Sequence, residues 1–192
     1  MSDQGDSQAG ASAENEHTGA DDASPSEQET LDELLKQERD IRFTSFSHDD
    51  AWAVGAHLVQ LASERSLPVA VAIMLGDQRA FHAGLAGASA DNDEWLERKF
   101  RVVRRYGHSS LAVGTRFRLD GGDFDTHSRL DTALYAAHGG AFPIIVQGSI
   151  VGIAGVSGLP QRDDHALVVE ALSAHRDRTR NARRRKRAAT SE

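Results

Sequence analysis

Two short stretches of the sequence combine histidine, glycine and aspartate in ways that suit ligand binding. The first is His138-Gly139-Gly140. An imidazole beside two glycines can meet a flat ligand or a metal ion, and glycine amides can bind an anion. The alternative is a helix terminus, where histidine meets the negative end of the helix dipole and the glycines let the chain reverse. The residues alone leave both interpretations open.

The second stretch is Asp164-His165, at the start of the last predicted helix. Backbone amides in a first helical turn can hold a carboxylate or a phosphate, although aspartates are also ordinary residues of that turn. If His138 and His165 converged at a sheet edge, with Asp164 supporting them, they could coordinate a metal. The predicted ligand-binding residues are therefore His138, Gly139, Gly140, Asp164 and His165, and if a metal is bound, its ligand is His138 or His165.

Several kinds of chemistry are excluded or disfavoured. The chain has no cysteine, so it has no disulfide, zinc–thiolate site or iron–sulfur cluster. His108-Ser109-Ser110 lacks the Gly-x-Ser-x-Gly pattern of a serine nucleophile, and no phosphate-binding or dinucleotide-binding glycine motif is present. The sequence therefore favours a binding protein over an enzyme.

Charge divides the 192 residues into three parts. Residues 1–30 carry eight acidic and no basic side chains, and we expect a disordered acidic tail. Residues 176–192 carry eight basic side chains, and we expect a basic disordered tail. Such a tail can attract nucleic acid non-specifically, but no aromatic residues interleave with it, so a solubilising role is favoured. Residues 31–175 form the predicted globular domain.

No apolar run is long enough to cross a bilayer, and the N-terminus lacks the features of a secretory signal. We therefore expect a cytoplasmic protein without membrane contact.

The elements around these motifs follow from hydrophobic periodicity and capping residues. Two tight hairpins indicate an antiparallel sheet covered by helices. Segment 111–119 fits either a helix or a strand, and segment 131–137 fits one or two helical turns. The predicted helices are 31–40 (capped by Thr30), 48–67, 89–106 and 161–175, and the predicted strands are 69–75, 79–83, 142–147 and 150–156.

Two further features concern packing. Lys99 falls in a cluster of positive residues that complements the C-terminal dipole of its helix. Gly152 and Gly155 lie inside a predicted strand, which indicates that a packed helix or another subunit approaches the backbone there. We expect that strand to form a sheet edge that receives a ligand or a second subunit.

The motifs together resemble the uncharacterised protein family UPF0303, a branch of the haem-degrading-domain and GlcG-like superfamily. The resemblance rests on 90–95, on Tyr106-Gly107-His108-Ser109-Ser110, on 136–144 and on 151–168. It implies an α/β (α+β), profilin-like fold with an antiparallel sheet of about five strands, and a homo-oligomer. The fifth strand would lie at 111–119 or at 41–44.

The resemblance also implies a function. We expect a cytoplasmic, homo-oligomeric protein that binds a small-molecule ligand, with haem or a related tetrapyrrole as the cofactor and no established catalysis. The alternative is an oligomeric scaffold or adaptor that binds protein partners without small-molecule chemistry.

Overall fold

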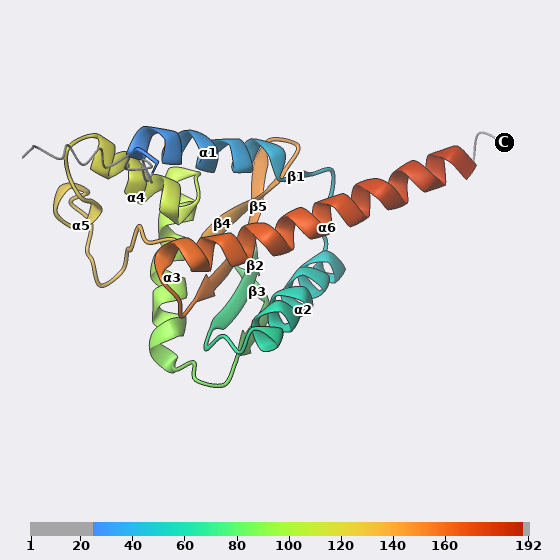
Figure 1. Ribbon diagram of the computed structural model, residues 1–192, viewed down its shortest axis with the longest axis horizontal. Coiled ribbons are helices and arrows are strands. Elements are labelled where there is room, and N and C mark those ends of the chain that lie inside the picture. The colour runs from blue at the N-terminus through green and yellow to red at the C-terminus, as the bar shows by residue number, and fades with distance from the viewer. Residues whose placement is uncertain (1–24, 190–192) are drawn as a thin grey trace, which may run out of the picture.

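A computed structural model describes residues 25–189, which form a five-stranded sheet with helices on both faces (Figure 1). The strand order is β1-β4-β5-β2-β3, with β5 in the centre. The α/β fold predicted from the sequence is therefore confirmed. The helices are α1 (Glu27–Asp40), α2 (His48–Glu64), α3 (Ala90–Tyr106), α4 (Ser110–Leu119), α5 (Phe124–His127) and α6 (Gln161–Ala189), and the strands are β1 (Arg42–Phe43), β2 (Ala70–Leu75), β3 (Gln78–Gly84), β4 (Ala141–Val146) and β5 (Ser149–Ser157).

Two antiparallel hairpins build most of the sheet, as predicted. β2 pairs with β3, and β4 pairs with β5. Each turn contains a glycine with a positive φ, Gly76 in the first and Gly148 in the second. A residue with a side chain rarely adopts a positive φ, so glycine suits both positions. β2 and β5 then pair antiparallel and join the hairpins into one sheet.

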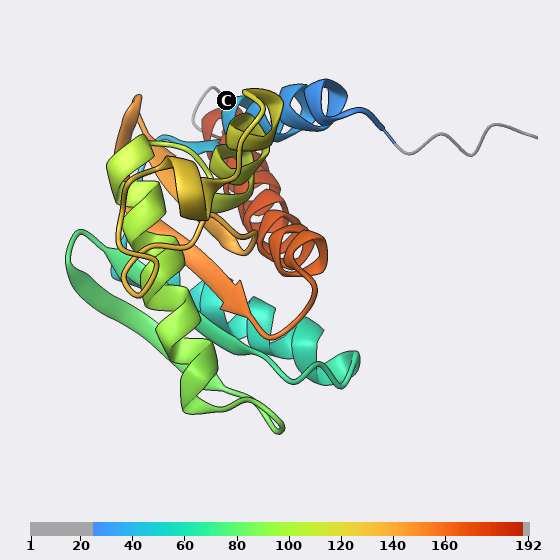
Figure 2. The ribbon, with the colours of Figure 1, turned by 90° about the vertical axis from the view of Figure 1, so that its left-hand side faces the viewer.

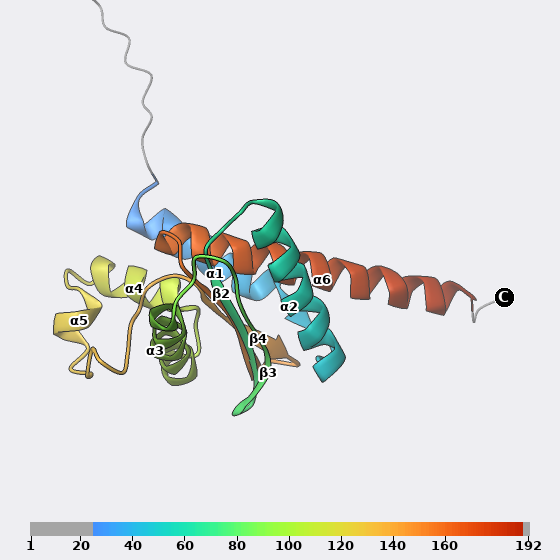
Figure 3. The same cartoon turned by 90° about the horizontal axis from the view of Figure 1, so that it is seen from below.

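Side chains alternate between the two faces of the sheet along each strand, and both faces are apolar. On one face, Val71 and Ile73 pack with residues of α2 and α6. On the other, Ala70, Ala72 and Met74 pack against α3. Figures 2 and 3 show α3 on one side of the strands and α2 on the other. The small residues on the α3 face let that helix lie close to the sheet.

The fifth strand is β1, one of the two positions that the sequence left open. It pairs with β4 in parallel, so the sheet is mixed rather than wholly antiparallel. The other position, 111–119, is helical, because Ser109 caps α4 by accepting a hydrogen bond from the amide of Ala112. α4 packs on α1 through Leu31, Leu34, Leu111 and Ala112.

The glycine-bearing strand does not form an edge, so that expectation is wrong. It is β5, the central strand. A Cβ at Gly155 would overlap the ring of Phe100 and approach Leu96 Cδ2 to 2.8 Å, both on α3. The close approach indicated by the glycine is therefore that of a packed helix of the same chain.

Both predicted domain boundaries differ from the structure. α1 begins at Glu27, because Ser26 and Glu29 form a capping box, so Thr30 is not the cap. Residues 27–30 are thus helical, and the rest of the predicted acidic tail up to residue 24 lies outside the described residues. α6 continues to Ala189, so residues 176–189 are helical where the sequence predicts a disordered tail. Residues 190–192 lie outside the described residues.

Segment 131–137 forms only a single turn, in which the amide of Tyr135 donates to the carbonyl of Asp131. Among residues 25–189, no helix is both long enough and apolar enough to cross a membrane.

Candidate functional site

A pocket lies between the first half of α3 and the start of α6. Its volume is about 290 Å³. It lies where the loop after β5 meets the loop that leads into β4. Its lining is mostly polar and comprises Asp91, Asn92, Trp95, Lys99, His138, Ser157, Gly158, Leu159, Gln161 and Asp164.

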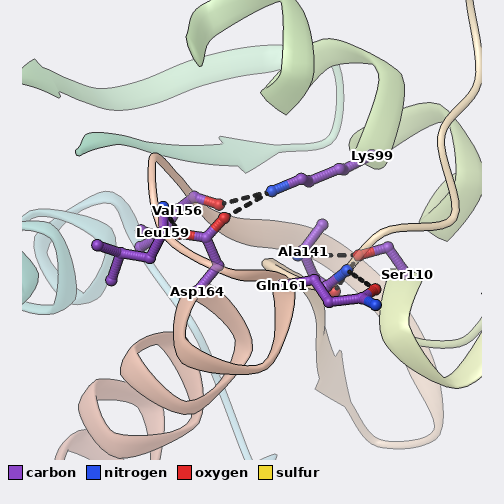
Figure 4. Close-up of polar contacts among 8 residues, drawn as sticks. Lys99, Ser110, Ala141, Val156, Leu159, Gln161 and Asp164 are labelled. Carbon is purple, nitrogen blue, oxygen red and sulfur yellow. Dashed lines mark hydrogen bonds and ion pairs between the residues drawn. The ribbon is translucent and has the colours of Figure 1, made fainter. Parts of the chain in front are cut away.

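A buried ion pair closes the inner end of this pocket (Figure 4). Lys99 Nζ on α3 lies 2.9 Å from Asp164 Oδ2 on α6, and it also donates to the carbonyl oxygen of Val156 at 3.3 Å. The other carboxylate oxygen of Asp164 accepts the amide of Leu159 at 3.0 Å. Asp164 is thus not an ordinary first-turn acid: it ties the loop after β5 to both helices.

Burial acts on both members of the pair. It lowers the pKa of Lys99 and raises the pKa of Asp164, because each charge has lost most of its hydration, while the opposite charge of the partner counteracts both changes. The two charges therefore depend on each other, and loss of either one leaves the other buried and unpaired.

The His138-Gly139-Gly140 segment packs directly against this structure. A Cβ at Gly139 would overlap the carbonyl oxygen of Gln161, and a Cβ at Gly140 would approach Lys99 Nζ to 2.8 Å. Gly140 also has a φ of +121°. Both glycines are buried. Their small size thus allows the loop to lie against α6 and the ion pair.

Hydrogen bonds hold the loop on its other side. The hydroxyl of Ser110 accepts the amide of Ala141 at 3.1 Å and contacts its carbonyl at 3.4 Å (Figure 4). No helix precedes His138, since Tyr135–His138 has no regular structure. The helix-terminus alternative for this motif is therefore wrong.

His138 lies at the mouth of the pocket with its side chain exposed. Its ring makes an edge contact with Trp95, with centroids 5.2 Å apart, and Arg98 covers the Trp95 ring at 3.8 Å. Partial burial of the ring lowers the pKa of His138; the cations Lys99 and Arg98 act in the same direction, and Asp125 acts in the opposite one. A lowered pKa favours the neutral imidazole, the form that can bind a metal.

His165 lies in a different place. It is buried, its Nε2 lies 2.9 Å from Gln37 Oε1, and it lines a hollow of about 480 Å³ between α1 and α6. Burial lowers its pKa to about 4. Asp164 and His165 are neighbours on a helix and point in different directions, so only Asp164 joins His138 in the pocket. The condition for a metal site shared by the two histidines, that they converge, is therefore not met.

Among the pocket residues that the sequence did not predict, Lys99 and Trp95 matter most for the site. The sequence groups Lys99 with positive residues that complement the helix dipole, yet it lies three residues after Leu96 and four before Val103, on the apolar stripe of α3. A lysine within the apolar stripe of a helix indicates a buried charge that needs a partner, and this pattern could have identified Lys99 from the sequence. Within residues 25–189, no group of three His, Asp or Glu side chains is placed to hold a metal ion.

Comparisons with known proteins agree with this architecture. Residues 46–173 match the family model "Haem degrading protein HbpS-like". A UPF0303 protein of Streptomyces avermitilis is 58% identical over 144 residues, which cover 74% of this chain and 88% of that protein.

Among solved structures, Ybr137w protein has a TM-score of 0.70 at 30% identity, covering 78% of this chain and 88% of its own. A PduOC–haem complex has a TM-score of 0.56 at 16% identity, covering 68% and 94%, and shows the fold alone. The match over most of the globular part, together with the identity to curated relatives, identifies the chain as a member of the UPF0303 family, within the HbpS-like haem-degrading domain superfamily.

Proposed function

We propose that this protein is a cytoplasmic ligand-binding protein that holds haem or a related tetrapyrrole through His138, without catalysis of its own. The observation that carries the proposal is the state of the His138 ring. Within the described residues, its ring nitrogens have no hydrogen-bond partner while the ring lines the pocket, whereas the rings of His82, His108, His165 and His175 are all engaged. His57 Nδ1 also lacks a partner, but His57 does not line this pocket.

The surroundings of His138 suit a flat ligand. A second hollow of about 210 Å³ adjoins the first and shares His138 and Gln161 with it. His138 therefore stands between two hollows, with the aromatic ring of Trp95 beside it.

The residues present fit haem with one protein ligand. His138 supplies an accessible imidazole with a lowered pKa, and His165 is buried and engaged with Gln37, so it does not serve as a second ligand. Bound haem would supply an iron centre with a strong Soret absorbance. The family model named for haem-degrading proteins and the PduOC–haem complex support the same ligand class.

Haem titration of the full chain tests the proposal, with the Soret band as the readout. Wild type and His82→Ala, which removes an exposed histidine on β3, should bind haem with the same spectrum. His138→Ala should lose the Soret shift while keeping its circular dichroism. If wild type binds no haem, or if His138→Ala binds it unchanged, the proposal fails, and the adaptor alternative is favoured.

We further propose that the protein forms a homo-oligomer. Trp52 on α2 is 66% exposed and contacts Phe81 of the edge strand β3, with ring centroids 5.5 Å apart. An exposed tryptophan beside an unpaired strand edge is typical of a subunit contact. Trp52→Glu should lower the mass measured by light scattering, and an unchanged mass would remove this surface from the interface.

A further inference from the structure

The strongest concentration of charge in the described residues lies outside the His138 pocket. The second half of α6, together with β1 and the end of α1, forms a hollow of about 440 Å³. We call it the arginine groove. Its lining comprises Arg42, Arg176, Arg180, Arg183, Arg184 and Arg187, with Asp40, Phe43, Thr44 and Thr179.

The arginines of α6 occupy one face of the helix. Positions 176, 180, 183, 184 and 187 follow the three- and four-residue spacing that places side chains in one stripe. Arg178 and Arg185 lie on the same helix but do not line the groove. The groove is thus a specific face, and Figure 1 shows this part of α6 extending beyond the body of the molecule.

The positive charge of the groove has little compensation from its own lining. Asp40 is the one acidic residue there, and it also pairs with Lys36 at 3.5 Å. Arg183 donates to the neutral hydroxyl of Ser45. Arg176 donates to the carbonyl of Asp40 and also pairs with its neighbour Asp177 at 2.9 Å, outside the groove lining. Like charges at four-residue spacing repel each other, so an anionic occupant would stabilise this part of the helix.

The chain itself carries a segment of opposite charge. Residues 1–24 contain six acidic and no basic side chains: Asp3, Asp6, Glu14, Glu16, Asp21 and Asp22. We propose that this acidic segment binds the arginine groove of its own chain. Tethering gives it an effective concentration that a free polyanion in solution does not have.

The length of chain between each acidic residue and Ser26 determines whether that residue can reach the arginine groove. α1 has 14 residues and lies between the segment and the groove, a distance of about 21 Å. Glu14 and Glu16 are separated from Ser26 by enough chain to span about 33–40 Å. Asp21 and Asp22 can span only about 13–17 Å. Glu14 and Glu16 can therefore reach the groove, as can the more distant Asp3 and Asp6, whereas Asp21 and Asp22 cannot.

Energy transfer measures the contact in the full chain. The absence of native cysteines allows labels at Ser12→Cys and Ala182→Cys alone. Transfer should be high at 50 mM NaCl and at least halve at 500 mM, because salt screens the charges. It should be unchanged when labelled chains are diluted tenfold with unlabelled protein. The proposal is wrong if the transfer does not change with salt, or if it disappears when labelled chains are diluted with unlabelled protein.

Two pairs of matched variants locate the contact. Glu14→Gln/Glu16→Gln should lower the transfer as high salt does, whereas Asp21→Asn/Asp22→Asn should not. Likewise, Arg180→Glu/Arg184→Glu should lower it, whereas Arg178→Glu/Arg185→Glu, on the other face of α6, should not. Equal effects within either pair would show an unspecific charge attraction and contradict the groove.

A polyanion probe distinguishes the acidic segment from nucleic acid as the occupant. A 20-base-pair DNA duplex should bind Glu14→Gln/Glu16→Gln at least fivefold more tightly than wild type, since the competing segment is weakened. Equal binding would mean that the groove is already open in the wild-type protein, and the proposal would be wrong.

Discussion

The ammonium of Lys99 and the carboxylate of Asp164 meet 2.9 Å apart in the interior, where their side chains are only 3% and 2% exposed. This pair connects α3 to α6, and Gly140 packs directly against it. It therefore supports both the fold and the loop that carries His138.

Removing one member of this pair should be strongly destabilising. Lys99→Met should lower the free energy of unfolding by about 3–5 kcal/mol, because Asp164 would be left buried and unpaired. The double variant Lys99→Met/Asp164→Leu should recover only part of that loss, because it removes the unpaired charge but also the acceptor of the Leu159 amide. Arg65→Met, which breaks the exposed pair with Glu170, serves as the control and should leave stability close to wild type. Urea unfolding measures all of them; similar losses for the buried and exposed pairs would contradict this assignment.

The loop with His138 should be sensitive to a single methyl group. Gly140→Ala should cost about 3 kcal/mol, because the φ of +121° is unfavourable for alanine and the new Cβ meets Lys99. Gly148→Ala is the matched control: its φ of +87° is also positive, but nothing lies within 4 Å of the new Cβ. It should cost about 1 kcal/mol. Thermal unfolding compares the two, and equal losses would argue against the tight packing of Gly140.

Gly155 at the centre of the sheet and Phe100 on α3 should be energetically coupled. Gly155→Ala should cost about 1–3 kcal/mol, since its Cβ would overlap the ring of Phe100. Phe100→Leu makes room at the same place, so the double variant should lose less than the two single variants added together. A double-mutant cycle by chemical denaturation gives the coupling. Additive losses would show that the two residues do not share this space.

His165 should make stability depend on pH. Its pKa in the folded protein is about 4, against 6.5 for an ordinary histidine, so between these values the unfolded chain binds more protons. Stability from this group is complete above pH 6.5 and is lost as the pH falls towards about 4, by about 3 kcal/mol in total.

The variant His165→Leu isolates this effect. It should lack that part of the pH profile, and His82→Leu, at an exposed histidine, should retain it. Urea unfolding from pH 7.5 to 4 provides the comparison. A profile for His165→Leu that parallels wild type would exclude His165 as the cause.

Local patterns predicted much of this fold. The seven-residue apolar run at Val69 and the glycine turns at Gly76 and Gly148 predict both hairpins, because strand propensity and turn geometry act over a few residues. β1 is different. It has two residues, and its pairing with β4 depends on chain about a hundred residues away, which no local pattern contains.

The candidate site was predicted only in part for the same reason. His138 and Asp164 stand out by residue type, and both line the pocket. The partner of Asp164 is not visible in its neighbourhood, since Lys99 lies on another helix. His165 was linked to His138 by its residue type, but its position on α6, one residue after Asp164, turns it towards α1.

The position of β5 has a consequence for the nascent chain. β5 is the central strand, yet among the described residues it is the last strand to leave the ribosome. Until it emerges, the hairpin of β2 and β3 presents an unpaired apolar edge along β2. The sheet can therefore close only after β5 has emerged, and until then that edge can bind other chains or a chaperone.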